Sequence, residues 1–336
     1  MASAAIPYYS VYIVSGGTKY NLTSVLISLG MSESRKQVAQ SATISLMNIK
    51  VNGTWLSSLI RARDRVFIYA STGNGSAEVF RGFVWRRTYQ SSLSERELSF
   101  VCYDNLIYLQ KSDASEFFAS GKTTEDVISS ICSEWGINLE YSYESITHSK
   151  LALRGKLSDI LMTDILDLVK DRTGKDYVIL SDQDTMKIKT VGQNSSVYSF
   201  TAGNNAIRTS SEQSMDDMIT KVIILGKKDK DDRYPVEAAL TKNTDTYGTI
   251  QKTISRDTNT TIEEAKEEGN NILSKNAEPK WEYVVSGPDV PWIRKGDKIY
   301  VNAGDIQGKS LIVEDVDRSI TSKSKKITLG LTEPAE

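Results

Sequence analysis

Two stretches of the chain, L-I-R-A-R-D-R-V-F-I-Y-A at residues 59–70 and W-I-R-K-G-D-K-I-Y-V-N-A at residues 292–303, repeat one local pattern. In each, a polar turn that contains an aspartate leads into a run of apolar, β-branched and aromatic residues, which is typical of a β-strand. At the four positions after the aspartate, the two stretches carry different but chemically similar side chains. The identical pairs are Ile60 and Ile293, Arg61 and Arg294, Asp64 and Asp297, and Ala70 and Ala303.

The sequence that follows each stretch indicates a duplication. After residue 70, and again after residue 303, the order is a glycine-rich loop, a strand, a polar turn and a second strand. The polar turns fall at residues 91–96 and 321–326, and the first glycine-rich loop is longer by about four residues. Because internal similarity constrains the architecture of a chain, we expect one small β domain that occurs twice.

The composition is typical of a globular protein with two or three domains. The chain has 336 residues, of which 39% are hydrophobic and 25% charged. Its net charge of −2, with both signs interspersed, does not favour specific nucleic-acid binding. No apolar run approaches the ~18 residues that span a bilayer, and the N-terminus does not resemble a signal peptide. We therefore expect no membrane insertion, and synthesis in a reducing cytoplasm that keeps Cys102 and Cys132 as thiols.

Changes of pattern along the chain predict an α+β fold, mostly β, with three domains. Residues 1–107 read as short strands separated by turns, which favours a small barrel or sandwich. Residues 108–198 contain two amphipathic helices and a hairpin, which indicates an α/β domain. Residues 199–336 return to β character and include a peripheral insertion around 226–280.

Helix starts can be placed from capping residues. Thr123 or Thr124 is expected to cap the first helix of the middle domain, and Ser158 the second. Thr261 and Glu264 form a T-x-x-E capping box, which predicts the start of a helix in the insertion.

Residues that could carry catalysis are few and scattered. His148 is the only histidine, Cys102 lies in an alternating strand and Cys132 on the apolar face of a helix, which are usual places for inert core cysteines. We therefore predict no enzyme, no cofactor and no metal site. The carboxylates that could serve glycoside cleavage fall on the polar face of the second helix: Asp159, Asp164 and Asp167.

The recurring turn leaves two interpretations of its charged residues open. Each arginine is either a surface residue beside a strand or part of a salt bridge between subunits that is used at both copies. The candidate ring-interface residues are Arg61, Asp64, Arg65, Arg294, Asp297 and Lys298.

Two further motifs accompany the repeated stretches: V-x-I-V-S-G-G at residues 11–17 and D-D-M-I-T-K-V-I-I-L-G at residues 216–226. With these motifs in this order, the chain resembles the XkdQ/YqbQ-like tail proteins of Gram-positive prophages and phage-tail-like bacteriocins, which are baseplate hub proteins of contractile tails. The resemblance covers nearly the whole chain and depends on the order of the motifs and on the length.

The resemblance implies two tail-tube-like β-barrel domains related by internal duplication, with the α/β domain between them. It implies a homotrimer whose six tube domains form a pseudo-hexameric ring between the sixfold tail tube protein and the threefold central spike protein, beside other baseplate proteins. A trimer can match a hexamer only if each chain supplies two near-equivalent surfaces. The implied location is the tail of a virion or phage-like particle, assembled in the bacterial host cytoplasm. The alternative is a tail-associated cell-wall hydrolase or a wall-binding tail-tip protein.

Overall fold

The computed structural model describes residues 6–73, 75–92, 96–256 and 260–334. The chain divides into two compact units: unit 1 comprises residues 1–210 and 283–336, and unit 2 comprises residues 211–282. The fold is mostly β, as expected. Parts of the glycine-rich loop after residue 70 and of the polar turn at 91–96 lie outside the described residues. The boundaries of the three expected domains stay a prediction.

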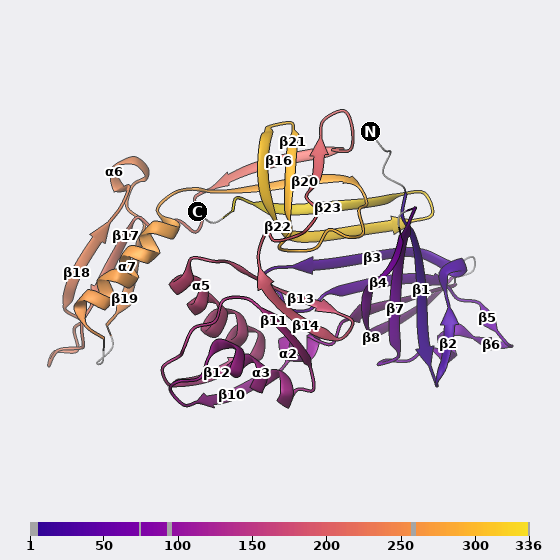
Figure 1. Ribbon diagram of the computed structural model, residues 1–336, viewed down its shortest axis with the longest axis horizontal. Coiled ribbons are helices and arrows are strands. Elements are labelled where there is room, and N and C mark those ends of the chain that lie inside the picture. The colour runs from indigo at the N-terminus through magenta and orange to yellow at the C-terminus, as the bar shows by residue number, and fades with distance from the viewer. Residues whose placement is uncertain (1–5, 74, 93–95, 257–259, 335–336) are drawn as a thin grey trace. The chain divides into compact units, whose positions relative to one another are not determined.

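The first β module, at residues 8–103 of unit 1, is an antiparallel sheet with strand order β3-β4-β9-β8-β7-β1-β2 (Figure 1). Alternate residues face its core, so that Val11 and Ile13 of β1 and Val66 and Ile68 of β7 are buried. The elements of the module are β1 (Tyr8–Ser15), β2 (Thr18–Asn21), η1 (Thr23–Val25), β3 (Leu26–Ser34), β4 (Ser41–Met47), β5 (Lys50–Val51), β6 (Thr54–Trp55), α1 (Leu56–Leu59), β7 (Arg65–Thr72), β8 (Gly75–Ser91) and β9 (Arg96–Tyr103).

The second β module repeats most of this strand order, as β16-β20-β23-β22-β21-β15. One pairing differs, because β15 runs parallel to β21 whereas β1 runs antiparallel to β7. Strands β16 and β20 also carry the chain from unit 1 into unit 2 and back. The strands of the module are β15 (Tyr198–Thr201), β16 (Arg208–Ser214), β20 (Lys280–Pro288), β21 (Lys298–Ala303), β22 (Ile306–Thr321) and β23 (Lys325–Thr332).

The two modules share the position of a β-bulge. In β8 the register against β9 shifts between Val84 and Arg86, and in β22 the register against β23 shifts between Val313 and Asp315. The residue before each bulge donates its N–H to the backbone carbonyl of the repeated aspartate. Val84 donates to Asp64 O and Val313 donates to Asp297 O, both at 2.9 Å. A bulge at one equivalent position lets the two modules be aligned residue by residue.

The modules are joined through strand β22, whose second half pairs antiparallel with β3 from Asp315 opposite Ser34 to Thr321 opposite Ser28 (Figure 1). The pairings of the described strands leave β2, β15 and β16 with one neighbouring strand each, so neither module closes into the expected barrel. The physical reason is that β3 and β22 pair with each other across the modules.

The middle of unit 1 packs helices and short strands around a core of its own. Strands β13 and β14 form the expected hairpin, and β11 runs parallel to β14. The elements are α2 (Ile107–Lys111), β10 (Asp113–Phe118), α3 (Thr124–Glu134), β11 (Asn138–Ser142), β12 (Leu151–Lys156), α4 (Leu157–Asp159), the π-helix η2 (Ile160–Leu166), α5 (Asp167–Thr173), β13 (Tyr177–Asp182) and β14 (Thr185–Thr190).

The predicted helix caps agree with the structure at two of three places. Thr123 caps α3 in a capping box with Asp126, and Thr261 caps α7 in a capping box with Glu264. The expected cap at Ser158 is wrong, because the helix starts earlier, after Lys156, and the Ser158 hydroxyl donates to the Asp159 carboxylate instead.

Unit 2 is a three-stranded sheet with one long helix. Strand β17 is central, antiparallel to β18 and parallel to β19. Helix α7 approaches the sheet closely at Gly269, where a Cβ atom would lie 2.7 Å from the Leu240 side chain. No helix within the described residues is both long and apolar enough to cross a membrane. The elements are β17 (Lys221–Leu225), β18 (Val236–Thr241), α6 (Thr244–Tyr247), β19 (Gln251–Ser255) and α7 (Ile262–Asn276).

Candidate functional site

The aspartate of each repeated stretch closes a turn. The Arg61 N–H donates to Asp64 Oδ2 at 2.7 Å, and the Arg294 N–H donates to Asp297 Oδ2 at 2.8 Å. The aspartate N–H returns a bond to the arginine carbonyl in both turns, at 3.3 Å and 3.2 Å. Since aspartate stabilises such turns by bonding to nearby backbone N–H groups, the repeated Arg-x-x-Asp pattern has a local structural cause.

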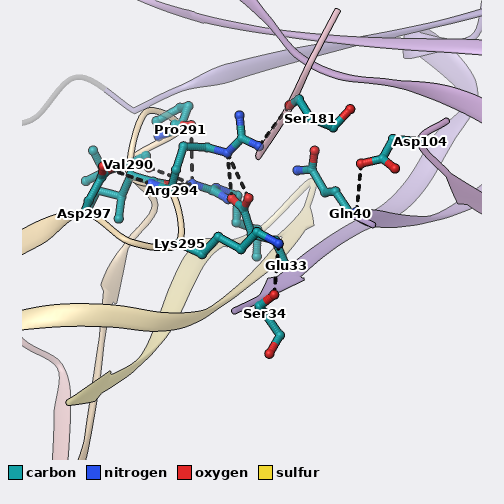
Figure 2. Close-up of polar contacts among 12 residues, drawn as sticks. Glu33, Ser34, Gln40, Asp104, Ser181, Val290, Pro291, Arg294, Lys295 and Asp297 are labelled. Carbon is teal, nitrogen blue, oxygen red and sulfur yellow. Dashed lines mark hydrogen bonds and ion pairs between the residues drawn. The ribbon is translucent and has the colours of Figure 1, made fainter. Parts of the chain in front are cut away.

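The side chain of Arg294 leaves the second module and binds the first. Its Nε atom lies 2.9 Å from each carboxylate oxygen of Glu33 on β3, and its Nη2 atom donates to Ser181 O at 3.2 Å (Figure 2). The Glu33 side chain is fully buried, while that of Arg294 is 23% exposed. Charge-assisted bonds of this kind are about twice as strong as neutral ones, so this contact helps to fix the junction of the modules.

The next residue, Lys295, strengthens the same junction. It is 2% exposed, and its Nζ atom donates to Ser34 O at 3.0 Å (Figure 2). The same atom also donates to Gln37 O at 2.5 Å. Burial lowers the pKa of Lys295. Burial also raises the pKa of Asp104, which accepts the Gln40 N–H at 2.8 Å. Neither Lys295 nor Asp104 was recognised from the sequence.

Arg318 of β22 forms a third buried contact at the junction. Its Nε atom lies 3.2 Å from Asp289 Oδ1, and its Nη1 atom lies 3.8 Å from Glu33 Oε1. Asp289 also accepts a hydrogen bond from the Tyr9 hydroxyl of β1. Each of these charges has a partner of opposite sign, as buried ionic groups require.

The equivalent residues of the first module have different surroundings. Arg61 is exposed. The Arg65 guanidinium lies 2.6 Å from Asp184 Oδ2, on the hairpin of β13 and β14. Lys298, the counterpart of Arg65 in the second module, donates its backbone N–H to Asn194 Oδ1 at 2.7 Å. Of the six candidate residues, Arg294 therefore lies directly at the junction of the modules, whereas Arg61 has the same turn but faces solvent.

The groups considered for catalysis do not come together. His148 is 2% exposed, and its Nε2 atom lies 2.9 Å from Thr124 Oγ1. Cys102 and Cys132 are buried thiols, and burial raises the pKa of Cys132 to about 12. Within the described part of the chain, no group of three or more His, Cys, Asp or Glu residues could hold a metal ion.

Solved structures of phage tail proteins have a similar fold. The 43 kDa tail protein of prophage MuSo2 from Shewanella oneidensis aligns with a TM-score of 0.69 and 14% identity, over 97% of this chain and 98% of that one. The tail protein from Neisseria meningitidis MC58 aligns with a TM-score of 0.69 and 15% identity, over 97% and 96%. A chain of the half-lidded Francisella PdpA–VgrG complex aligns with a TM-score of 0.60 and 10% identity, over 98% and 58%.

The family assignment comes from a sequence match. A search of curated proteins found no match. A family model described as YQBQ-like matches residues 29–332, which include most of both β modules and all of the region between them. The chain therefore belongs to the YQBQ-like family.

Proposed function

We propose that the chain is a structural baseplate hub protein of a contractile phage tail or phage-like particle. Three chains assemble into a ring of six β modules, which are tail-tube-like domains that arose by internal duplication. One face of this pseudo-hexameric ring contacts the sixfold tail tube protein and the other the threefold central spike protein, with other baseplate proteins around it. Assembly occurs in the bacterial host cytoplasm, and the protein has no enzymatic activity.

The observation that carries this proposal is the junction of β3 with β22. Inside one chain, the two modules share strand order and bulge position, and one is joined to the other by a strand pairing and buried ion pairs. The joined surfaces are different on the two modules, so the contact is heterologous. Heterologous contacts close into rings when the rotation between neighbours is a simple fraction of a turn. A sixfold arrangement of modules needs three chains.

Two further observations support the proposal. The fold is similar to that of two phage tail proteins over almost their entire length. A chain in a complex that contains VgrG has a similar fold as well, which is consistent with a position beside a spike. On this proposal, Arg294, Asp297 and Lys298 belong to the module junction within a chain, and Arg61, Asp64 and Arg65 to the equivalent junction between chains.

Light scattering on the purified chain and a reconstruction of the assembled tail test the proposal together. We expect a trimer, and a ring with six similar modules in the tail. A chain located outside a trimeric ring in the assembled tail would contradict it. Release of peptidoglycan fragments by the purified chain would instead favour the wall-hydrolase alternative.

A further inference from the structure

The turn and the bulge together show which residues of the two modules correspond. The Arg63 N–H donates to Val84 O, and the Gly296 N–H donates to Val313 O, both at 2.7 Å. The residue inside the bulge then follows in each module. The corresponding pairs are Arg61 and Arg294, Ala62 and Lys295, Arg63 and Gly296, Trp85 and Glu314, and Arg86 and Asp315.

In the second module these five positions are covered by the end of β3. Arg294 binds Glu33, and the Arg35 N–H donates to Glu314 O at 2.9 Å. The Arg35 guanidinium also forms an ion pair with the Glu314 carboxylate at 2.5 Å. All five positions of the second module are therefore buried or half-buried.

In the first module the same five positions are exposed. The side chain of Trp85 is 41% exposed. Its ring makes edge contacts with the rings of Tyr103 and Tyr108, whose centroids lie 6.1 Å and 5.9 Å away. These contacts support the indole from one side and leave the rest of it free to bind. Tryptophan is among the residues that most often dominate the binding energy of a protein interface.

The charges at these positions differ between the modules. In the second module, Glu314 and Asp315 balance Arg294 and Lys295. In the first module the five positions contain three arginines and no carboxylate. The nearby Asp64 carboxylate accepts the Arg61 N–H within the turn. A partner that covers this surface therefore has to offer carboxylates around an apolar group.

We infer that Trp85 and the three arginines around it bind a carboxylate-bearing surface of a second copy of the chain, in a contact that salt weakens. This inference deepens the proposed function and rests on it. The cover of the second module is the first module of the same chain, through the pairing of β3 with β22. Because the two modules of one chain are already joined in this way, an equivalent cover for the first module has to come from another chain.

The two kinds of junction should respond differently to salt. Within a chain, the Glu33 side chain has no exposed surface and Lys295 is 2% exposed, so dissolved ions screen these charges little. Between chains, Arg61, Arg63 and Arg86 are exposed before association. Exposed charges act over a distance that falls from about 10 Å in 0.1 M salt to about 3 Å in 1 M salt. Their contribution to association should fall accordingly.

Reversing two of the charges tests the surface. The variant Arg61→Glu/Arg86→Glu changes two exposed side chains of the proposed contact. Its matched control is Lys150→Glu/Arg154→Glu, which makes the same change of net charge at exposed residues between the modules. Arg61→Lys/Arg86→Lys keeps the charge. Light scattering of the full chain over a dilution series, in about 0.05 M and about 0.5 M salt, gives the midpoint concentration of trimer formation. Calorimetry of the monomer checks that each variant folds.

We expect the midpoint concentration of the native chain to rise about tenfold between low and high salt. Arg61→Glu/Arg86→Glu should raise it by a similar factor at low salt, while the control and the lysine variant stay within about twofold of the native chain. The melting temperatures of the monomers should agree within about 2 °C.

An equal effect of the variant and its control, or a midpoint that does not change with salt, would overturn the inference and leave the proposed trimeric hub in place. A chain that stays monomeric at low salt and high concentration would overturn the inference as well. In that case the reconstruction of the assembled tail decides the proposed function.

Discussion

Replacing Glu33 by alanine tests whether the module junction is held by its buried ion pairs. Glu33 has no exposed side-chain surface, and its removal leaves Arg294 and the buried Arg318 without a partner at this position. Loss of one member of a buried ion pair costs about 3–5 kcal/mol. The lower end of that range applies, because Arg294 is 23% exposed and water can solvate it in the variant.

The control is the same substitution at an exposed glutamate, Glu212 of strand β16. Glu212 is exposed, so Glu212→Ala should change the free energy of unfolding by no more than about 0.5 kcal/mol. Glu33→Ala should lower the melting temperature of unit 1 by roughly 6–12 °C, since 1 kcal/mol corresponds to about 2–4 °C in a domain of this size. Calorimetry at concentrations where the chain is monomeric measures both. Equal shifts of melting temperature in the two variants, or a shift below about 2 °C for Glu33→Ala, would contradict a junction held by these ion pairs.

Four further substitutions test local features of the fold. Gly296→Ala should lower the melting temperature, because Gly296 has φ = 81° and a Cβ atom there would lie 2.7 Å from the Val178 side chain. Arg63 is the equivalent residue of the first module and has φ = 72°, so the control Arg63→Gly should be close to neutral. Burial lowers the pKa of His148 in the folded chain, and the charge of Arg172 lowers it further. The unfolded chain therefore binds the proton first, below pH about 6.5, and folding stability should fall as the pH drops through this value. His148→Gln should therefore lose less stability than the native chain between pH 7 and pH 5, and an identical loss would contradict this. Thr123→Ala should cost about 1 kcal/mol by removing the cap of α3, and chemical denaturation with no change in midpoint would argue against that role.

Features that depend on neighbours in sequence could be predicted. The strands after Asp64 and Asp297 form as expected, because a polar turn followed by β-branched and aromatic residues has few alternatives. The capping boxes at Thr123 and Thr261 also follow from residues three positions apart. Ser158 failed as a cap because the helix starts earlier, with Lys156 at the N-cap position, so that Ser158 lies inside the first turn.

The junction could not be predicted, because its parts are far apart in sequence. The Arg294 pair with Glu33 joins residues separated by 261 positions, and nothing in the local sequence identifies a partner at that distance. One signal was present: Leu29, Met31 and Glu33 lie at alternate positions of β3, so that Glu33 shares the buried face of two apolar residues. A charged residue in such a pattern indicates a buried ion pair.

The mass of the assembled protein tests whether two joined β modules per chain supply a ring of six. Native mass spectrometry, or light scattering, of the purified chain measures this mass directly. We expect a species with three times the 37.3 kDa mass of one chain. A dimer as the assembled species would contradict a ring of six modules.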